Sequence, residues 1–327
     1  MHTVGASNML ELRRIGAGFC GSVWAPTQGD PSAFKREDGG PGRSLFNDFE
    51  MHMRVLESLD RLTGLGDTDL SLHIQVPQCY RFIEATDQEW WNKNLTSFPR
   101  GYSPCNVLHS ERIPPLPQNI REFLIDEYCP TPLISEIKAS DANQDCLIRP
   151  YLGRRRITPS NKDWPSRYKA FSLRNFPLHE DQMEDLGIGA DITTCAEMMA
   201  ETLAMIHWYG GLDANDVEFV LAPPRNGTQP RLSNALGGHT MWLLDFDCCR
   251  WMTMDAKGVD QAVTAFLRND PFYPRPGQPL WEKFRDRYLQ VSSNIVIIED
   301  KRRKPLPEMF IGRVEEAQWK RNERRVP

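Results

Sequence analysis

Three glycines near the start of the chain have the spacing of a loop that binds phosphate. Gly16, Gly18 and Gly21 fit the pattern Gly-x-Gly-x-x-Gly, and Val23 follows them. Glycines let a backbone turn tightly and approach a phosphate without a Cβ clash. A short apolar segment follows instead of a helix, which favours a nucleotide-covering hairpin over a dinucleotide-binding turn. A glycine hairpin without a ligand is the alternative.

A lysine follows this loop within another short apolar segment. Lys35 ends the run Ala33-Phe-Lys35, where a lysine can reach the α- and β-phosphates of a nucleotide. Such a lysine needs an acidic partner to hold it. We expect Glu50, on the following helix, to be that partner, with Glu57 as the second candidate. Taken alone, Lys35 also fits a surface lysine.

A polar loop after the strongest helical segment carries several carboxylates. Asp213 lies in this loop, and Glu218 follows five positions later. A carboxylate here can orient or deprotonate an attacking hydroxyl, so Asp213 is the candidate catalytic base. Glu218 is a candidate magnesium ligand. An ordinary turn rich in Asp and Asn is the alternative interpretation.

Two aspartates stand at the end of an apolar segment. Asp245 and Asp247 close the run Trp242-Leu-Leu-Asp-Phe-Asp247. A carboxylate at the end of a buried strand is costly unless it binds a cation or hydrogen-bond donors. We therefore expect both residues to contribute to a Mg²⁺ site that coordinates nucleotide phosphates. A solvated strand end is the alternative.

These features follow one another in the order found in kinases: glycine loop, lysine, helical acid, aspartate loop and strand-end aspartate. The elements that position the first of them are short strands at 10–24 and 32–36 and a helix at 44–59. Small β elements come early and helices dominate late. The expected fold is α+β and two-lobed like a protein kinase. Residues 1–117 form a small β-rich lobe with the glycine loop and hinge, and residues 118–327 form a larger, mainly helical lobe.

Apolar spacing predicts the other elements. The helix at 44–59 is expected to bury Leu45, Phe49, Met53 and Leu56. The helix at 191–209 is expected to start with a capping box from Thr194 to Glu197 and to end at Gly210-Gly211. Residues 157–190 receive no assignment, and 130–190 no role. Further strands are expected at 72–84, 107–113, 146–151, 219–221 and 241–246, loops or hairpins at 87–104 and 223–239, and helices at 118–128, 259–267 and 280–289.

Composition excludes several classes of protein. The chain has 327 residues and a net charge of -5, which gives no overall attraction to nucleic acid or anionic membranes. The N-terminus lacks the apolar core of a signal peptide, and no run is apolar enough to span a bilayer. We expect a cytoplasmic protein. The basic run Lys301–Lys304 fits a nuclear localisation signal, or more simply a solvated end.

The cysteines do not have the spacing of a zinc site. All eight are dispersed, apart from the adjacent pair Cys248-Cys249, and none form a Cys-x-x-Cys pair. A structural zinc site needs closely spaced ligand pairs. We therefore expect no structural zinc and reduced, mostly buried thiols.

The motifs resemble the aminoglycoside-phosphotransferase branch of the protein-kinase-like superfamily. The loop Gly211–Glu218 resembles its His-Gly-Asp-x-x-x-x-Asn catalytic loop with substitutions, and Leu244–Asp247 resembles its metal-binding aspartate segment. More closely, the chain resembles a fungal family that sometimes carries a zinc-finger-like label. The similar stretches are His207-Trp208, Asp213–Leu221 and Tyr273–Pro276, and this resemblance covers most of the chain.

The resemblance implies a role for each matching residue. Glu218 stands where the branch has Asn, which adds a negative charge at the metal site. The implied roles are phosphate binding by Lys35, pairing with Lys35 by Glu50, adenine recognition by the backbone of the hinge Glu111–Ile113, catalysis by Asp213, and metal binding by Glu218 and Asp245.

Three functions follow as hypotheses. The first is an ATP- and Mg²⁺-dependent phosphotransferase that acts on a hydroxyl of a small-molecule acceptor. The second is a pseudokinase, a nucleotide-binding scaffold without transfer, which Glu218 favours. The third is an ATP-using enzyme that transfers AMP or activates a carboxylate. The sequence identifies neither the acceptor nor the oligomeric state.

Overall fold

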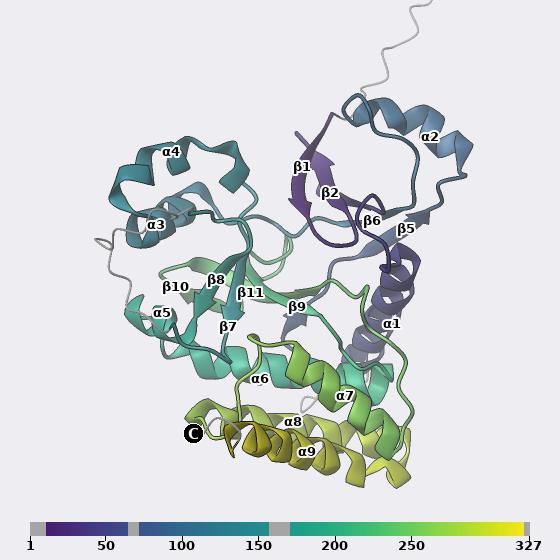
Figure 1. The fold of residues 1–327 in the computed structure, drawn as a ribbon, viewed down its shortest axis with the longest axis vertical. Helices are drawn as coiled ribbons and strands as arrows, with labels where there is room; N and C mark the ends of the chain where they lie inside the picture. The colour runs from purple at the N-terminus through teal and green to yellow at the C-terminus, as the bar shows by residue number, and fades with distance from the viewer. Residues whose placement is uncertain (1–10, 65–71, 157–170, 324–327) are drawn as a thin grey trace, which may run out of the picture.

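An antiparallel sheet and one long helix, α1 (Leu45–Gly64), form the N-terminal part of the chain (Figure 1). The computed structural model describes residues 11–64, 72–156 and 171–323. The strand order in the sheet is β1-β2-β3-β6-β5, which are Leu12–Ala17, Ser22–Pro26, Ser32–Arg36, Val107–Glu111 and Cys79–Ile83.

The hairpin between β1 and β2 depends on one of its glycines. Gly21 has a φ of +154°, and a Cβ at this position would lie 1.9 Å from the carbonyl oxygen of Arg36 on β3. The Gly18 N–H closes the turn by donating to the Gly21 carbonyl at 2.8 Å. Gly21 therefore lets the hairpin fold back onto β3, as only a residue without a Cβ can.

The segment 87–104, expected to be a loop, contains the helix α2 (Gln88–Asn94). Asp87 caps this helix, because its Oδ1 accepts from the Trp90 N–H at 3.0 Å. Trp91 is buried against the apolar side of the N-terminal sheet. The expectation was wrong because the segment's polarity hid both a capping aspartate and a buried tryptophan.

Helix α1 buries only part of the face that apolar spacing predicted. Its start is marked by Ser44, whose Oγ accepts from the Asn47 N–H at 3.2 Å. Leu45 and Leu56 are buried and Phe49 is half-buried, but Met53 is 42% exposed, so the prediction is wrong at Met53. Three of the buried positions are polar, which the apolar pattern could not show. The buried residues are Leu45, Asp48, Met51, His52, Val55, Leu56, Ser58 and Leu62.

A second sheet lies below the first (Figure 1). β10 and the first residues of β11 form a hairpin inside the predicted loop or hairpin at 223–239, with Leu232 opposite His239. The short strand β4 (Ile74–Gln75) pairs in parallel with β11, so a segment from the first 117 residues joins this sheet. The strand order is β10-β11-β9-β7-β8, which are Leu232–Asn234, Gly237–Leu244, Glu218–Ala222, Ile148–Tyr151 and Phe176–His179.

Helices dominate the C-terminal part, and α6 to α9 stack beneath the second sheet (Figure 1). The architecture is thus α+β, with an antiparallel N-terminal sheet and a helical C-terminal part, as expected. The basic run Lys301–Lys304 lies in the turn between α8 and α9. No helix within the described ranges is long and apolar enough to cross a membrane. The helices are α3 (Gln118–Tyr128), α4 (Ile134–Ala139), α5 (Glu180–Asp185), α6 (Asp191–Ala204), α7 (Ala256–Arg268), α8 (Pro279–Glu299) and α9 (Pro305–Glu323).

Helix α6 starts earlier than the predicted capping box. It begins at Asp191, so Thr194 lies inside the helix, and the Ala190 cap makes no side-chain hydrogen bond. The capping-box prediction is therefore wrong. The unassigned segment 157–190 holds β8 and α5, and its part 157–170 lies outside the described residues.

The end of α6 is held by α1. A π-helical turn, Met205–Gly210, extends α6, and Gly211 ends it with a φ of +71°, as the paired glycines predicted. Arg54 of α1 donates to the carbonyl oxygens of Tyr209 at 2.8 Å and Gly210 at 3.0 Å. Helix α1 thereby fixes the start of the loop that carries Asp213.

Replacing Arg54 by methionine is expected to lower the free energy of unfolding by about 1–3 kcal/mol, because the two carbonyls lose a charged donor. Urea denaturation measures the change. The control is Arg302→Met, whose side chain is 91% exposed and whose loss should cost less than about 0.5 kcal/mol. Equal losses in both variants would contradict this anchoring role.

Candidate functional site

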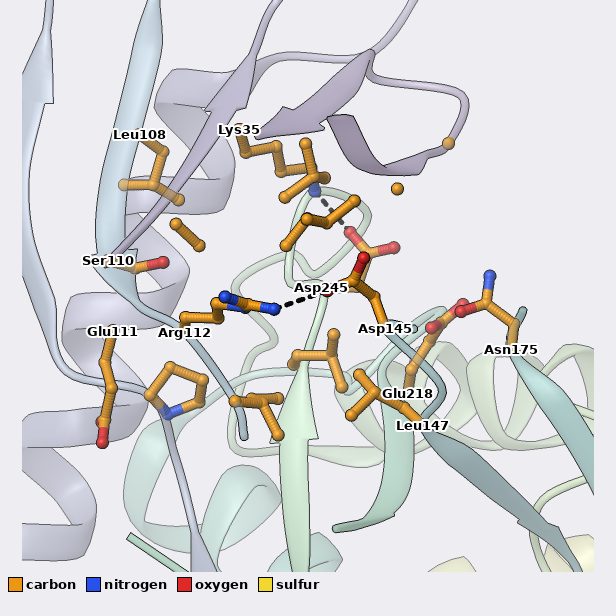
Figure 2. Close-up of a pocket in the computed structure, with 18 of the residues that line it drawn as sticks. Lys35, Leu108, Ser110, Glu111, Arg112, Asp145, Leu147, Asn175, Glu218 and Asp245 are labelled. Carbon is orange, nitrogen blue, oxygen red and sulfur yellow. Dashed lines mark hydrogen bonds and ion pairs between the residues drawn. The ribbon is translucent and has the colours of Figure 1, made fainter. Parts of the chain in front are cut away.

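A pocket of about 240 Å³ lies between the two sheets (Figure 2). The N-terminal sheet and its glycine turn form one wall, and the ends of β9 and β11 form the opposite wall. Apolar side chains lie on both walls, and charged residues lie at several places around the pocket (Figure 2). The part lined by Lys35, Asp48 and Asp245 is called the charged end. The lining includes Gly16, Gly18, Val23, Ala33, Lys35, Asp48, Glu111, Arg112, Ile113, Asp145, Leu147, Arg149, Glu218, Leu244 and Asp245.

Lys35 joins the two walls of the pocket. Its Nζ lies 2.6 Å from Asp48 Oδ2 on α1 and 2.6 Å from Asp245 Oδ1 after β11. Burial lowers the pKa of Lys35, but Asp48 and Asp245 outweigh it and hold the pKa well above its usual value. The lysine is therefore a fixed cation at the charged end of the pocket.

The acidic partner of Lys35 on α1 is Asp48, so the expected pairing with Glu50 is wrong. Asp48 is 2% exposed, whereas Glu50 lies on the solvent side of the helix. Two residues along a helix turn a side chain by about 200°, which puts Glu50 on the far face. Asp48 follows buried Leu45 by three positions, so an acid on the buried face was the missed signal.

Helix α1 also holds the loop after β11. Asp48 Oδ1 accepts from the Phe246 N–H at 3.1 Å. Asn47 Nδ2 donates to the carbonyl oxygens of Asp247 at 2.9 Å and Cys249 at 3.1 Å. Two adjacent side chains of α1 thus fix the loop that presents Asp245 to Lys35.

Sheet register places Glu218 beside Asp245. Leu244 of β11 lies opposite Glu218 of β9, so the next residue, Asp245, leaves the sheet at the same edge. Both carboxylates line the pocket, as the sequence predicted for a shared site. Arg149 of the neighbouring strand β7 donates to Glu218 Oε2 at 2.5 Å. Burial raises the pKa of Glu218 to about 7, although Arg149 opposes this shift.

The backbone is strained at Asp245 and in the aspartate loop. Asp245 has a φ of +66°, Ala214 of +53° and Asp216 of +65°. Residues with a Cβ rarely occupy this region, which costs about 1–3 kcal/mol each and is concentrated at functional sites. The surrounding contacts therefore hold these two loops in an unfavourable conformation.

Asp247 lies outside the pocket lining and binds an arginine. Arg43 Nη1 lies 2.8 Å from Asp247 Oδ1, and Nη2 lies 3.1 Å from Asp216 Oδ2. The same guanidinium contacts the Cys248 thiol. Asp216, Asp247 and Cys248 are close enough to one another to share a metal ion, but the guanidinium of Arg43 bonds all three. Asp247 is therefore not part of the set that contains Glu218 and Asp245.

Asp213, the expected base, is buried outside the pocket lining. It is 5% exposed. Its Oδ1 accepts from the backbone N–H groups of Arg250 at 2.9 Å and Asn215 at 3.1 Å, and its Oδ2 accepts from Gln261 Nε2 at 2.8 Å. These bonds make Asp213 an anchor of its loop in this conformation.

The glycine run divides into two roles. Gly16, Gly18 and Val23 line the pocket, whereas Gly21 does not. A Cβ at Gly18 would meet nothing within 4 Å, so no contact within the described chain requires glycine there. Gly18 thus leaves room for a ligand, and Gly21 serves the hairpin fold.

The hinge residues also differ from one another. The Glu111 N–H donates to the Gln78 carbonyl at 2.8 Å, and the Glu111 carboxylate binds Arg225 and points away from Lys35 (Figure 2). Glu111 therefore offers no N–H to a base. Ile113 has no backbone N–H partner among the described residues, so its N–H is the group that can bind one.

One edge of the pocket carries an ion pair that the sequence did not predict. Asp145 accepts from Arg112 Nη2 at 2.5 Å (Figure 2). It also accepts from both terminal nitrogens of Arg13 on β1. These residues are more than 30 positions apart along the chain, so no local pattern announced them. The cluster links the first strand to the segment before β7.

The donor set fits Mg²⁺ at Asp245 but not at Glu218. Mg²⁺ prefers carboxylate oxygens, and Asp245 has 35% of its side chain exposed, with Lys35 on one oxygen. Glu218 is more buried and holds the Arg149 guanidinium, which a metal ion would have to displace. The structure therefore disagrees with the expectation that Glu218 binds metal.

A comparison with protein families matches one part of this chain. A family model described as DUF3669, zinc finger protein, matches residues 241–300. That segment contains Asp245, α7 and all of α8, and its only cysteines are Cys248 and Cys249, with no histidine. A tetrahedral zinc finger needs four Cys or His ligands, so this segment alone cannot supply one. No curated protein matches the chain.

Replacing Asp48 by asparagine is expected to lower the free energy of unfolding by about 3 kcal/mol, the lower end for a broken buried pair, because Lys35 keeps Asp245. Chemical denaturation at neutral pH measures the loss. The matched variant Glu50→Gln removes the same charge from the exposed face of α1 and should cost less than about 0.5 kcal/mol. A larger loss in Glu50→Gln would restore Glu50 as the partner of Lys35.

Proposed function

We propose that this chain is a kinase-like protein and that its pocket binds ATP. The observation that carries the proposal is Lys35, held by Asp48 and Asp245 next to the glycine turn. A lysine fixed by an acid on the following helix, beside a strand-end aspartate, is the phosphate-binding arrangement of kinases.

The apolar part of the pocket suits the base. Val23 and Ala33 come from the N-terminal sheet, and Leu147 and Leu244 come from the other wall. A planar base that lies between such walls removes its apolar surface from contact with water. Burial of this kind is the main source of affinity in small-molecule pockets. The Ile113 N–H then hydrogen-bonds the edge of the base.

The charged end of the pocket suits the phosphates. Lys35 donates to the phosphate oxygens while Asp48 keeps its ammonium in place. The backbone at Gly16 and Gly18 allows the phosphates to approach closely. A Mg²⁺ ion held by Asp245 would offset further phosphate charge.

Phosphoryl transfer to a small-molecule hydroxyl is the second candidate function, and the strained backbone of Asp245 and of the aspartate loop favours it. In this function Asp213 is the base that accepts the proton of the acceptor hydroxyl. Among the described residues, Asp213 Oδ2 accepts only from Gln261 Nε2, and the Gln261 side chain can rotate away. This function therefore requires the acceptor hydroxyl to replace Gln261 as the hydrogen-bond donor to Asp213 Oδ2.

ATP is expected to raise the unfolding temperature of the wild-type chain, because a ligand that binds only the folded state stabilises it by about 2.7 kcal/mol at 100 times its Kd. Lys35→Met should lose this shift, each variant being compared with its own ligand-free form. Lys93→Met, at a lysine whose side chain is 69% exposed, is the control and should keep the shift. No shift in the wild type would contradict nucleotide binding.

Product analysis tests the transfer step. Incubation with Mg²⁺, labelled ATP and candidate hydroxyl acceptors should yield ADP, and Asp213→Asn should lower the rate by about 100-fold or more while ATP binding persists. AMP and pyrophosphate as products would instead indicate AMP transfer or carboxylate activation. ATP binding without formation of any product would indicate a nucleotide-binding scaffold that does not transfer phosphate.

A further inference from the structure

Every carboxylate expected to bind metal already has a basic side chain as its partner. Lys35 bonds Asp245, Arg149 bonds Glu218, and Arg43 bonds Asp247. Of these three cations, Lys35 and Arg149 line the pocket, and Arg43 does not. Lys35 and Arg149 are thus two fixed cations of the pocket lining, which also contains Arg174 and the Arg112 that binds Asp145.

We infer that Arg149 binds the phosphates of the nucleotide directly and stands in for a second metal ion, and that Glu218 positions it. This inference rests on the proposed nucleotide function. It assigns Arg149 a binding role that the sequence did not indicate, and it makes Glu218 a positioning residue.

The geometry of Arg149 fits this role. Arg149 belongs to β7, which pairs with β9, so its side chain reaches Glu218 from the adjacent strand. The bond to Glu218 uses one of the five N–H donors of the guanidinium. Its Nε–H has no partner among the described residues, but it is closed to a ligand because it has almost no accessible surface. The Nη1 group donates to none of the described residues and is not closed off in this way, so it is the group left for a ligand. Arg149 therefore keeps donors for a ligand in the pocket that it lines.

The chemistry favours arginine over a second metal ion here. A guanidinium is always charged, and its planar fork matches the oxygens of a phosphate. A metal ion at Glu218 would displace Arg149. The Arg149 guanidinium, whose side chain is only 20% exposed, would then have lost its carboxylate partner. Separating such a pair is strongly unfavourable. A nucleotide phosphate, in contrast, can join the existing pair without breaking it.

The consequence is that ATP binding depends little on divalent metal. With Arg149 and Lys35 in place, removal of Mg²⁺ takes away only the ion at Asp245. If Glu218 instead held metal, its substitution would weaken only the part of binding that Mg²⁺ adds. The two roles of Glu218 therefore predict different metal dependence.

The test is the Kd of ATP, measured by calorimetry on the full chain with EDTA and with Mg²⁺. The wild type is expected to bind in both, with less than about a tenfold difference. Arg149→Met should weaken binding in EDTA by about 10- to 100-fold, the value of a charged hydrogen bond, and Mg²⁺ should restore part of it. Glu218→Gln should weaken ATP binding equally with EDTA and with Mg²⁺.

A matched control separates this effect from a general loss of positive charge. Arg154→Met removes an arginine that pairs with Asp270 outside the pocket, and it should leave both values of Kd within about twofold. Urea denaturation confirms that each variant is folded. A second variant, Arg149→Lys, keeps the charge and should bind in EDTA better than Arg149→Met.

Three results would overturn the inference alone: wild-type binding that requires Mg²⁺, a Glu218→Gln variant that loses only the Mg²⁺-dependent part of binding, or unchanged binding by Arg149→Met in EDTA. Failure of the wild type to bind ATP in either condition would overturn the proposed function as well.

Discussion

The position of Lys35 between two carboxylates ties the N-terminal sheet to the rest of the molecule. One carboxylate, Asp48, lies on α1, and the other, Asp245, follows β11 of the second sheet. A buried ammonium is stable only if it is paired. The Nζ atom of Lys35 therefore joins three elements: β3, α1 and the loop after β11. The strained backbone at Asp245 is held in place there, because Asp48 also bonds the Phe246 N–H.

Helix α1 extends this constraint along its length. Its first turn holds the loop after β11 through Asn47 and Asp48, and Arg54, further on, binds the end of the π-helical turn before the aspartate loop. One helix thus positions both polar loops of the C-terminal part. The same loops contain the strained residues, so α1 maintains the conformation that the candidate site needs.

Motifs local in sequence predicted much of the site, and long-range pairs could not be predicted. Lys35 was identified because it lies in a short apolar strand, and Asp245 because it directly follows one, where a buried charge needs a partner. Asp48 was missed because the apolar pattern counts no polar residue on the buried face of α1, and Arg149 because its partner Glu218 is 69 residues away. The sequence likewise predicted an α+β class but not the order of the strands in either sheet. Asp213 was identified as a loop residue, but its burial depends on Gln261 and on the backbone of Arg250, which no local pattern indicates.

The central claim is that the charged end of the pocket binds nucleotide phosphates. A crystal structure of the full chain with a non-hydrolysable ATP analogue tests this most directly. We expect the phosphates within hydrogen-bond distance of Lys35 Nζ, with the base between the apolar walls that contain Val23 and Leu244. A crystal structure in which the analogue, at saturating concentration, leaves this pocket empty and Lys35 bound only to Asp48 and Asp245 would contradict the claim.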